Sequence, residues 1–400
     1  MATGTPDEGA HRIGGNVRAA RRAKGMSLDV LAGLVGRSKG WLSKIENGKA
    51  RLERRGDIAA LAEALQVSAD HLLGGPAPEV RPDRRQVNLL PLQRMLLDAG
   101  PSDPPDVRAR PIEALRDGLT GVDAALRRAD HPAVARVLPD LIGELYVHAA
   151  SGSERARSQA LRLLILACGS DAACTLRHLG ENHLAYISGE RAQQAADLLG
   201  DPVWTGAAAY ARAHARASAN RPRPLLRTPQ AADALEPYVG DDVFAHQVHG
   251  MLRLSAALAR AVEGDHRGAD DQAGEAARLA SRIGEDSEAF ELFGPANVGV
   301  WRASLAVEAA RPEHALRCAE AVNPRALSSG NRRAALHMEK ARALAMLDRD
   351  REAVRELCRA ERLSAAQLHN HPLIRELVAD MLTRTGGREL RGLAWRMNLI

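Results

Sequence analysis

Apolar residues in the first part of the chain recur with the spacing of short amphipathic helices. Ile13, Val17 and Ala20 lie on one face of a first predicted helix. Ser27 is a favourable N-cap for a second helix, which Gly36 ends. Three more helices follow, whose inward residues are Leu42 and Ile45, then Ile58, Leu61, Ala62 and Leu65, then Leu72 and Leu73. Five short helices with a glycine turn between the second and third predict a helix-turn-helix arrangement.

The remainder of the chain also has a helical pattern, and some of its helices form pairs. Beyond Pro111, Ala-rich amphipathic segments are separated by short polar breaks. Three breaks share one setting, in which an Ala/Leu helix ends and a second helix with an early alanine begins, at 262–269, 310–315 and 347–353. The fold class predicted is therefore all-α, with either a helical-repeat solenoid or an irregular helical bundle after the N-terminal unit.

Prolines mark a boundary between these two parts. Eight of the chain's 20 prolines lie between Gly74 and Pro111, where average composition would give about two. Such a segment disfavours long helices and strands, although residues 89–97 can hold a short helix. We expect an N-terminal domain at 11–75, a Pro-rich linker at 76–110 and a helical domain at 111–400.

The positive charge of the chain is concentrated in the N-terminal unit. The 400 residues carry a net charge of +5. Residues 11–55 contain twelve Lys and Arg against three acidic residues, a local charge of +9, so the remaining residues sum to −4. A basic patch over a helix that fits a DNA groove is what binding to a polyanion requires. Aromatic residues make up only 3% of the chain, which favours closely packed Ala- and Leu-rich helices over sheets.

Two segments carry a resemblance to a known family. LAGLVGRSKGWLSKIENGKA (31–50) and IAALAEALQVSADHLLGG (58–75) resemble the Cro/phage-repressor (XRE) helix-turn-helix family. The resemblance implies a five-helix Cro/repressor-type domain whose third helix enters the major groove. It also implies that an Arg of the first helix pairs with a Glu near the end of the third, which here are Arg21 and Glu46. The last helix pair, 333–363, resembles a tetratricopeptide (TPR) repeat, so the layout is similar to actinobacterial XRE-TPR transcriptional regulators.

The resemblance also indicates which residues are expected to face DNA. Leu28 and Lys39 stand where phage members often have Gln, so the operator sequence cannot be transferred from a relative. Trp41 has two interpretations, contact with a thymine methyl or the backbone, or packing onto the domain's own surface. Residues at the helix starts and on the third helix are expected to face DNA: Ser27, Ser38, Lys39, Gly40, Trp41, Ser43 and Lys44. Residues after that helix are expected to contact phosphates: Lys49, Arg51, Arg54 and Arg55.

The helical domain is expected to bind an effector, either a peptide or a small molecule, and to mediate dimerisation. Asn297 and Trp301 are spaced to face one way on a helix that starts at Pro295. The alternatives are that Trp301 lies in the core and Asn297 acts as a cap. Further candidates for a ligand groove are Asn331 and the stripe formed by His246, His249 and Arg253, for which a solvated face is the alternative.

Several functions are not supported by any motif. No apolar run reaches the ~18 residues of a membrane span, and the N-terminus lacks the apolar segment of a secretory signal. The four cysteines form no CxxC pair, and neither a metal, a cofactor nor a catalytic motif is apparent. We therefore expect a cytoplasmic, non-enzymatic regulator that binds a double-stranded DNA operator as a homodimer. The alternative is a TPR interaction scaffold or antitoxin-like module with secondary DNA contact.

Overall fold

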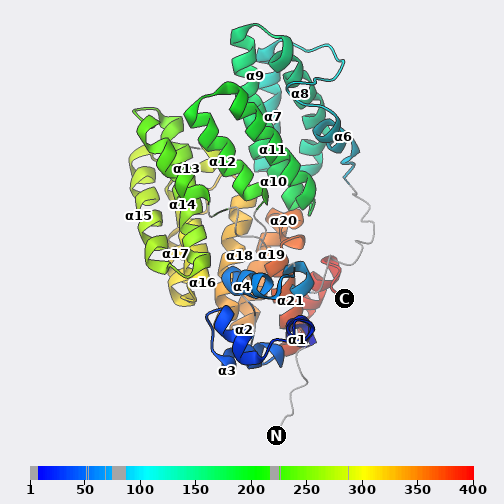
Figure 1. Ribbon diagram of the computed structural model, residues 1–400, viewed down its shortest axis with the longest axis vertical. Coiled ribbons are helices and arrows are strands. Elements are labelled where there is room, and N and C mark those ends of the chain that lie inside the picture. Colours follow the sequence, from blue (N-terminus) through cyan, green and yellow to red (C-terminus); the bar gives the residue numbers. More distant parts are fainter. Residues whose placement is uncertain are drawn as a thin grey trace.

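The protein is described here from a computed structural model. The residues that it describes are 8–50, 52, 54–67, 69–73, 87–216, 225, 227–286 and 288–400. Their regular structure is helical, apart from one isolated β-bridge between Gly100 and Asp103. The all-α prediction is therefore confirmed. A five-helix N-terminal unit lies at one end of the molecule (Figure 1). The helices from residue 90 onward form the rest of the molecule, which we call the body.

The N-terminal unit consists of α1 (Glu8–Ala23), α2 (Leu28–Leu34), α3 (Lys39–Glu46), α4 (Arg55–Leu65) and α5 (Ala69–Leu73). Its core contains all the residues expected to point inward from α1, α3, α4 and α5. In α2, Leu31 and Ala32 are buried, while Leu34 is 60% exposed. Leu34 lies three residues after Leu31 on a helix of only seven residues, and its side chain faces solvent.

The first half of the body begins with α6 (Leu90–Asp98), which falls inside the segment predicted as a linker, 76–110. Residues 76–86 lie outside the described residues. In α6, Leu92 and Leu96 are fully buried in the largest hydrophobic core. The helices that follow are α7 (Ile112–Arg127), α8 (His131–Ser151), α9 (Glu154–Leu166), α10 (Ala173–His178), α11 (Asn182–Leu199) and α12 (Pro202–Arg216).

A π-helical turn, η1 (Ala167–Ala172), connects α9 and α10. The continuous helical stretch Glu154–His178 is long and apolar enough, by length and composition, to cross a membrane. However, 67% of its most apolar window is buried inside the protein. A core helix passes the same test, so this stretch is weak evidence for a membrane span.

The second half of the body is built from helix hairpins. After α13 (Thr228–Leu235) and the 3-10 turn η3 (Glu236–Tyr238), α14 (Val243–Glu263) pairs with α15 (His266–Ile283). The next pairs are α16 (Pro295–Glu308) with α17 (Pro312–Ala321), and α18 (Gly330–Met346) with α19 (Asp350–Leu363). The three breaks predicted from the sequence are the three hairpin turns. Buried alanines fill the last hairpin, namely Ala341, Ala343, Ala345, Ala353 and Ala360.

The C-terminal helices connect the body to the N-terminal unit. They are α20 (Ala365–His369), α21 (Pro372–Arg384) and α22 (Arg388–Arg396), and α21 packs against α1 (Figure 1). Leu373 of α21 is buried in the core of the N-terminal unit. On another side, α4 packs against α14 so closely that a Cβ added at Gly56 would lie 2.5 Å from the carbonyl oxygen of Val262. Two contacts of different kinds therefore hold the unit on the body.

Candidate nucleic-acid interface

The turn between α2 and α3 is fixed by two serine caps and a glycine. The Ser27 hydroxyl accepts a hydrogen bond from the backbone N–H of Val30 at 3.2 Å, and the Ser38 hydroxyl accepts one from Trp41 at 3.1 Å. Each cap satisfies a backbone donor that the first turn of a helix leaves unpaired. Between the helices, Gly36 has a φ of +64°, a conformation that residues with a Cβ adopt rarely. Ser27 and Ser38 thus hold the backbone of the turn, and both are exposed to solvent.

Helix α3 is anchored to α1 through a buried carboxylate. Arg21 donates to both oxygens of Glu46, from Nε at 2.6 Å and from Nη2 at 2.8 Å. Its remaining nitrogen, Nη1, donates to the carbonyl oxygen of Met26 at 2.7 Å. The hydrogen bond to Glu46 raises the pKa of Arg21. The two residues expected to form a pair therefore do so, in the bidentate geometry that is strongest for arginine and a carboxylate.

A second arginine, which the sequence analysis did not single out, supports the same carboxylate. Arg18 Nη2 donates to the backbone carbonyl of Glu46 at 2.9 Å, and its Nε lies 3.4 Å from Oε2 of that residue. Arg18 and Arg21 are three residues apart on α1, so their side chains share one face of the helix. That spacing is the signal in the sequence that would have identified Arg18.

The outer face of α3 is open to solvent and carries positive charge. Lys39, Gly40 and Lys44 are exposed, and Ser43 is half-buried beside Asn47. Lys39 Nζ lies 2.7 Å from Asp29 Oδ2, in a pair whose side chains are both more than 60% exposed. Such a pair contributes little to stability and can exchange for a phosphate or a base. The face lies at the end of the molecule opposite α8 and α9 (Figure 1).

Trp41 packs onto its own domain. Its half-buried ring lies against the core of the N-terminal unit. The guanidinium carbon of Arg37 lies 5.6 Å from the ring centroid. Arg37 is itself held by Asp57 Oδ1, at 2.9 Å from Nε and 2.6 Å from Nη2. The ring therefore packs in part onto the domain, as one interpretation has it, while the part that stays exposed leaves contact with DNA as a prediction.

The four residues expected to contact phosphates have different surroundings. Lys49 is exposed beyond the end of α3, and Arg51 lies outside the described residues. The prediction is wrong for Arg54 and Arg55 in this arrangement, because both face the body. Arg54 Nε donates to the carbonyl oxygen of Glu308 at 2.8 Å. The N–H of Arg55 donates to Glu308 Oε2 at 3.0 Å. Charge alone suggested a DNA contact, but the turn into α4 points these side chains toward α16.

The comparison with family models agrees with this geometry. Residues 12–73 form a helix-turn-helix domain. The matching family model carries that description, and its bounds include all five helices except the first turn of α1. No curated protein and no solved structure matches the chain. The helix-turn-helix domain supports a DNA-binding regulator with DNA as a partner.

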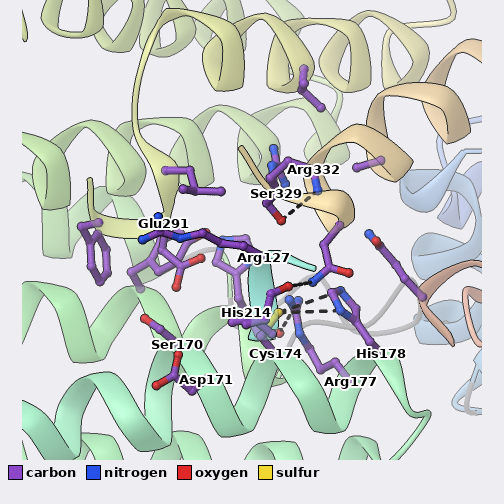
Figure 2. A pocket seen from close by; sticks show the side chains of 18 of the residues that line it. Arg127, Ser170, Asp171, Cys174, Arg177, His178, His214, Glu291, Ser329 and Arg332 are labelled. Carbon is purple, nitrogen blue, oxygen red and sulfur yellow. Dashed lines mark hydrogen bonds between the residues drawn. The ribbon is translucent and has the colours of Figure 1, made fainter. Parts of the chain in front are cut away.

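The body contains a cavity of about 670 Å³ that lies directly behind the helix-turn-helix domain. Two of the expected ligand residues, Trp301 and Asn331, line it. Asn297 is buried behind the wall, where it accepts a hydrogen bond from Arg332, a lining residue. Figure 2 shows the cavity, whose lining includes charged side chains that the sequence analysis did not identify, among them Asp171, Arg177, Glu291 and Arg332. Helical periodicity alone gave no signal for them, because they come from three separate segments: the helical stretch Glu154–His178, η4 (Phe290–Leu292) and α18.

The other three candidate ligand residues lie elsewhere. His246, His249 and Arg253 do not line this cavity, so grouping them with Trp301 was wrong. Arg253 donates to Asp233 at 2.9 Å and to Glu236 at 3.1 Å, and its Nε lies 3.2 Å from Nε2 of His249. The stripe connects α14 to α13 and η3. Burial, with the nearby Arg253 adding to it, lowers the pKa of His249.

Proposed function

We propose that this protein is a sequence-specific transcriptional regulator that binds an operator in double-stranded DNA as a homodimer. The observation that carries the proposal is the free, basic outer face of α3 in a helix-turn-helix domain whose opposite side is docked on the body. In such domains the second helix of the motif reads the major groove. The exposed Lys39 and Lys44 are placed to reach base edges or nearby phosphates.

The helical body is the regulatory part of the proposal. Its stacked hairpins support an XRE-TPR layout, and in this proposal it contributes the dimer contacts and binds an effector in its interior. The protein is a cytoplasmic binding protein and not an enzyme. A cavity of about 670 Å³ supports an effector of small-molecule size better than a partner protein, because drug-sized ligands occupy cavities of roughly 300–1,000 Å³.

The test is selection of bound duplexes from a randomised DNA library by the full-length protein, followed by mobility-shift titration of the recovered sequence. We expect an inverted repeat whose half-sites are about 34 Å apart, since two reading helices must enter one face of the duplex. Replacing Lys39 and Lys44 together by alanine should abolish the preference for the selected sequence. The matched control is Arg155→Ala with Arg157→Ala, two exposed charges at the start of α9, which should bind like the wild type.

Two outcomes would contradict the proposal. Binding that is equally strong for selected and random DNA would favour the scaffold or antitoxin-like alternative. Selection of a single, unrepeated site together with a monomeric mass in solution would contradict the homodimer.

A further inference from the structure

The cavity lies where the helix-turn-helix domain, the first half of the body and the C-terminal helices meet. Arg55, the first residue of α4, lines it. So do His371 and Pro372, at the start of the helix that inserts Leu373 into the helix-turn-helix core. A ligand in this cavity would therefore touch both contacts that position the DNA-binding domain.

Two segments with irregular backbone conformations contribute residues to the lining of the cavity. The π-helical turn η1 contributes Ser170 and Asp171. Opposite it, Glu291 and Leu292 have φ angles of +50° and +58°, in the left-handed region that residues other than glycine rarely adopt. Both irregularities are costly, and both are found preferentially at functional sites.

The cavity lining carries both acidic and basic groups. Figure 2 shows Ser170, Asp171 and Glu291 toward one side and Arg177, His178 and Arg332 toward the other, with Arg127 between them. Burial, with a smaller contribution from nearby carboxylates, raises the pKa of Asp171 well above its usual value. Burial also raises the pKa of Glu291. Within the described part of the chain, Arg177 and Arg332 form no salt bridge; Arg177 donates to the His214 carbonyl at 3.2 Å.

Some polar atoms of the lining lack partners in the described structure. They include the indole Nε1 of Trp301, Nε of Arg332 and Oε1 of Gln367, all buried from solvent. Buried polar atoms in native proteins are almost always hydrogen-bonded. Such atoms need a partner from within the cavity, either water or a polar ligand. Around them the wall is apolar, formed by leucines together with the rings of Tyr210 and Phe290.

We propose that the cavity binds a small amphoteric molecule with an apolar centre, and that its binding changes how the helix-turn-helix domain sits on the body. The inference rests on the proposed function, for which it specifies the effector site. An anionic group of the ligand pairs with Arg177 and Arg332, which form no salt bridge with any carboxylate of the described residues. A protonated amine pairs with Asp171 and Glu291, whose buried carboxyls become stable as anions only when a cation is beside them.

The binding test uses the free amino acids and the full set of dipeptides as amphoteric probes. Thermal-shift screening of the full-length protein identifies binders, and calorimetry measures their affinity. For each binder, the N-acetylated and the C-amidated forms are compared, because each lacks one of the two charges. We expect at least one probe to bind and both of its blocked forms to bind at least about tenfold weaker. Absence of any binder, or equal binding of a blocked form, would overturn the proposal.

Two variants test whether the ligand binds in this cavity. Asp171→Asn and Arg332→Met should each weaken binding by at least about tenfold, whereas Arg155→Ala with Arg157→Ala should not change it. Circular dichroism checks the fold. If either variant fails to fold, the blocked probes on the wild-type protein still decide the outcome. Wild-type affinity in both folded variants would contradict the assignment of the site.

The coupling is tested on the operator recovered by selection. Saturating ligand should change operator affinity by about 5- to 150-fold, the usual range for coupled sites. In Gly56→Ala, the added methyl separates α4 from α14, so the ligand should still bind while operator affinity no longer responds. An unresponsive wild type would overturn the coupling. If the protein binds no operator even in the absence of ligand, the proposed function itself has failed. Calorimetry without DNA still shows whether the ligand binds, so a failure of the ligand site and a failure of the proposed function can be distinguished.

Discussion

The carboxylate of Glu308 in α16 accepts a hydrogen bond from the backbone N–H of Arg55, the first residue of α4, at 3.0 Å. Glu308 is 1% exposed, and its other oxygen lies 2.9 Å from Nη2 of Arg342. A carboxylate at the start of a helix satisfies a free N–H and interacts favourably with the helix dipole. The body therefore supplies the N-terminal cap of a helix in the DNA-binding domain, which makes the position of that domain depend on the body.

Replacing Arg21 by methionine should destabilise the helix-turn-helix domain. The change leaves the buried Glu46 carboxylate without its bidentate partner. Removing one member of a buried pair costs about 3–5 kcal/mol, and we expect about 3 because Arg18 remains nearby. Urea unfolding measures the loss. Arg22→Met, at an exposed position of the same helix, is the matched control; equal losses in the two variants would contradict a role for the pair.

Neighbouring glycines of α1 should respond to alanine in opposite directions. A Cβ at Gly14 would lie 2.2 Å from the carbonyl oxygen of Ile45, whereas nothing lies within 4 Å of one at Gly15. Gly14→Ala should therefore force α1 and α3 apart, at a cost of about 1–3 kcal/mol. Gly15→Ala should stabilise by about 0.5–1 kcal/mol through its helix propensity. Thermal unfolding and operator affinity are the measurements, and a neutral Gly14→Ala would show that the two helices pack less closely.

Lys49 and Arg54 should differ in how DNA binding depends on salt. Lys49 is exposed beside α3, so Lys49→Ala should weaken specific and random DNA alike and lower the salt slope by about one unit. Arg54 donates to the Glu308 carbonyl, so Arg54→Ala should leave the slope unchanged. Mobility-shift titrations at several salt concentrations test both. A reduced slope for Arg54→Ala would mean that the domain leaves the body when it binds DNA.

The contact between α1 and α21 should make stability depend on pH. Burial raises the pKa of Glu376 to about 7, against the opposing effects of Arg12 and Arg375. The folded state therefore retains a proton between about pH 4.5 and pH 7 that the unfolded state has lost, so stability falls as pH rises through this window. Glu376→Gln should remove that fall, making the variant more stable than the wild type by about 1–3 kcal/mol at pH 8 and equal to it near pH 4.5.

Urea unfolding at the two pH values measures this difference. The exposed Glu389→Gln on α22 is the control and should behave like the wild type at both. A Glu376→Gln variant less stable than the wild type at pH 8 would show that the ion pair with Arg12, 3.3 Å away, outweighs the cost of burial.

The parts of the fold predicted from the sequence are those that local patterns encode. Serine caps, glycine turns and apolar periodicity act over a few residues, and they identified the helix-turn-helix domain and the three hairpin turns. The Arg21–Glu46 pair came from resemblance and not from periodicity. The docking of α4 was not predictable, because Arg55 and Glu308 are 253 residues apart and charge pattern does not say which surface meets a cation. The charged side chains of the cavity likewise come together only through packing.

Leu373 makes the hydrophobic core of the helix-turn-helix domain depend on a distant part of the chain. A DNA-binding domain whose own residues form its entire hydrophobic core can be joined to different partner domains during evolution. Here one core position is filled by a residue 300 positions after the last helix of the domain, Leu73. The helix-turn-helix segment of this chain is therefore not a self-contained module, since a substitution at either surface of that contact requires accommodation by the other.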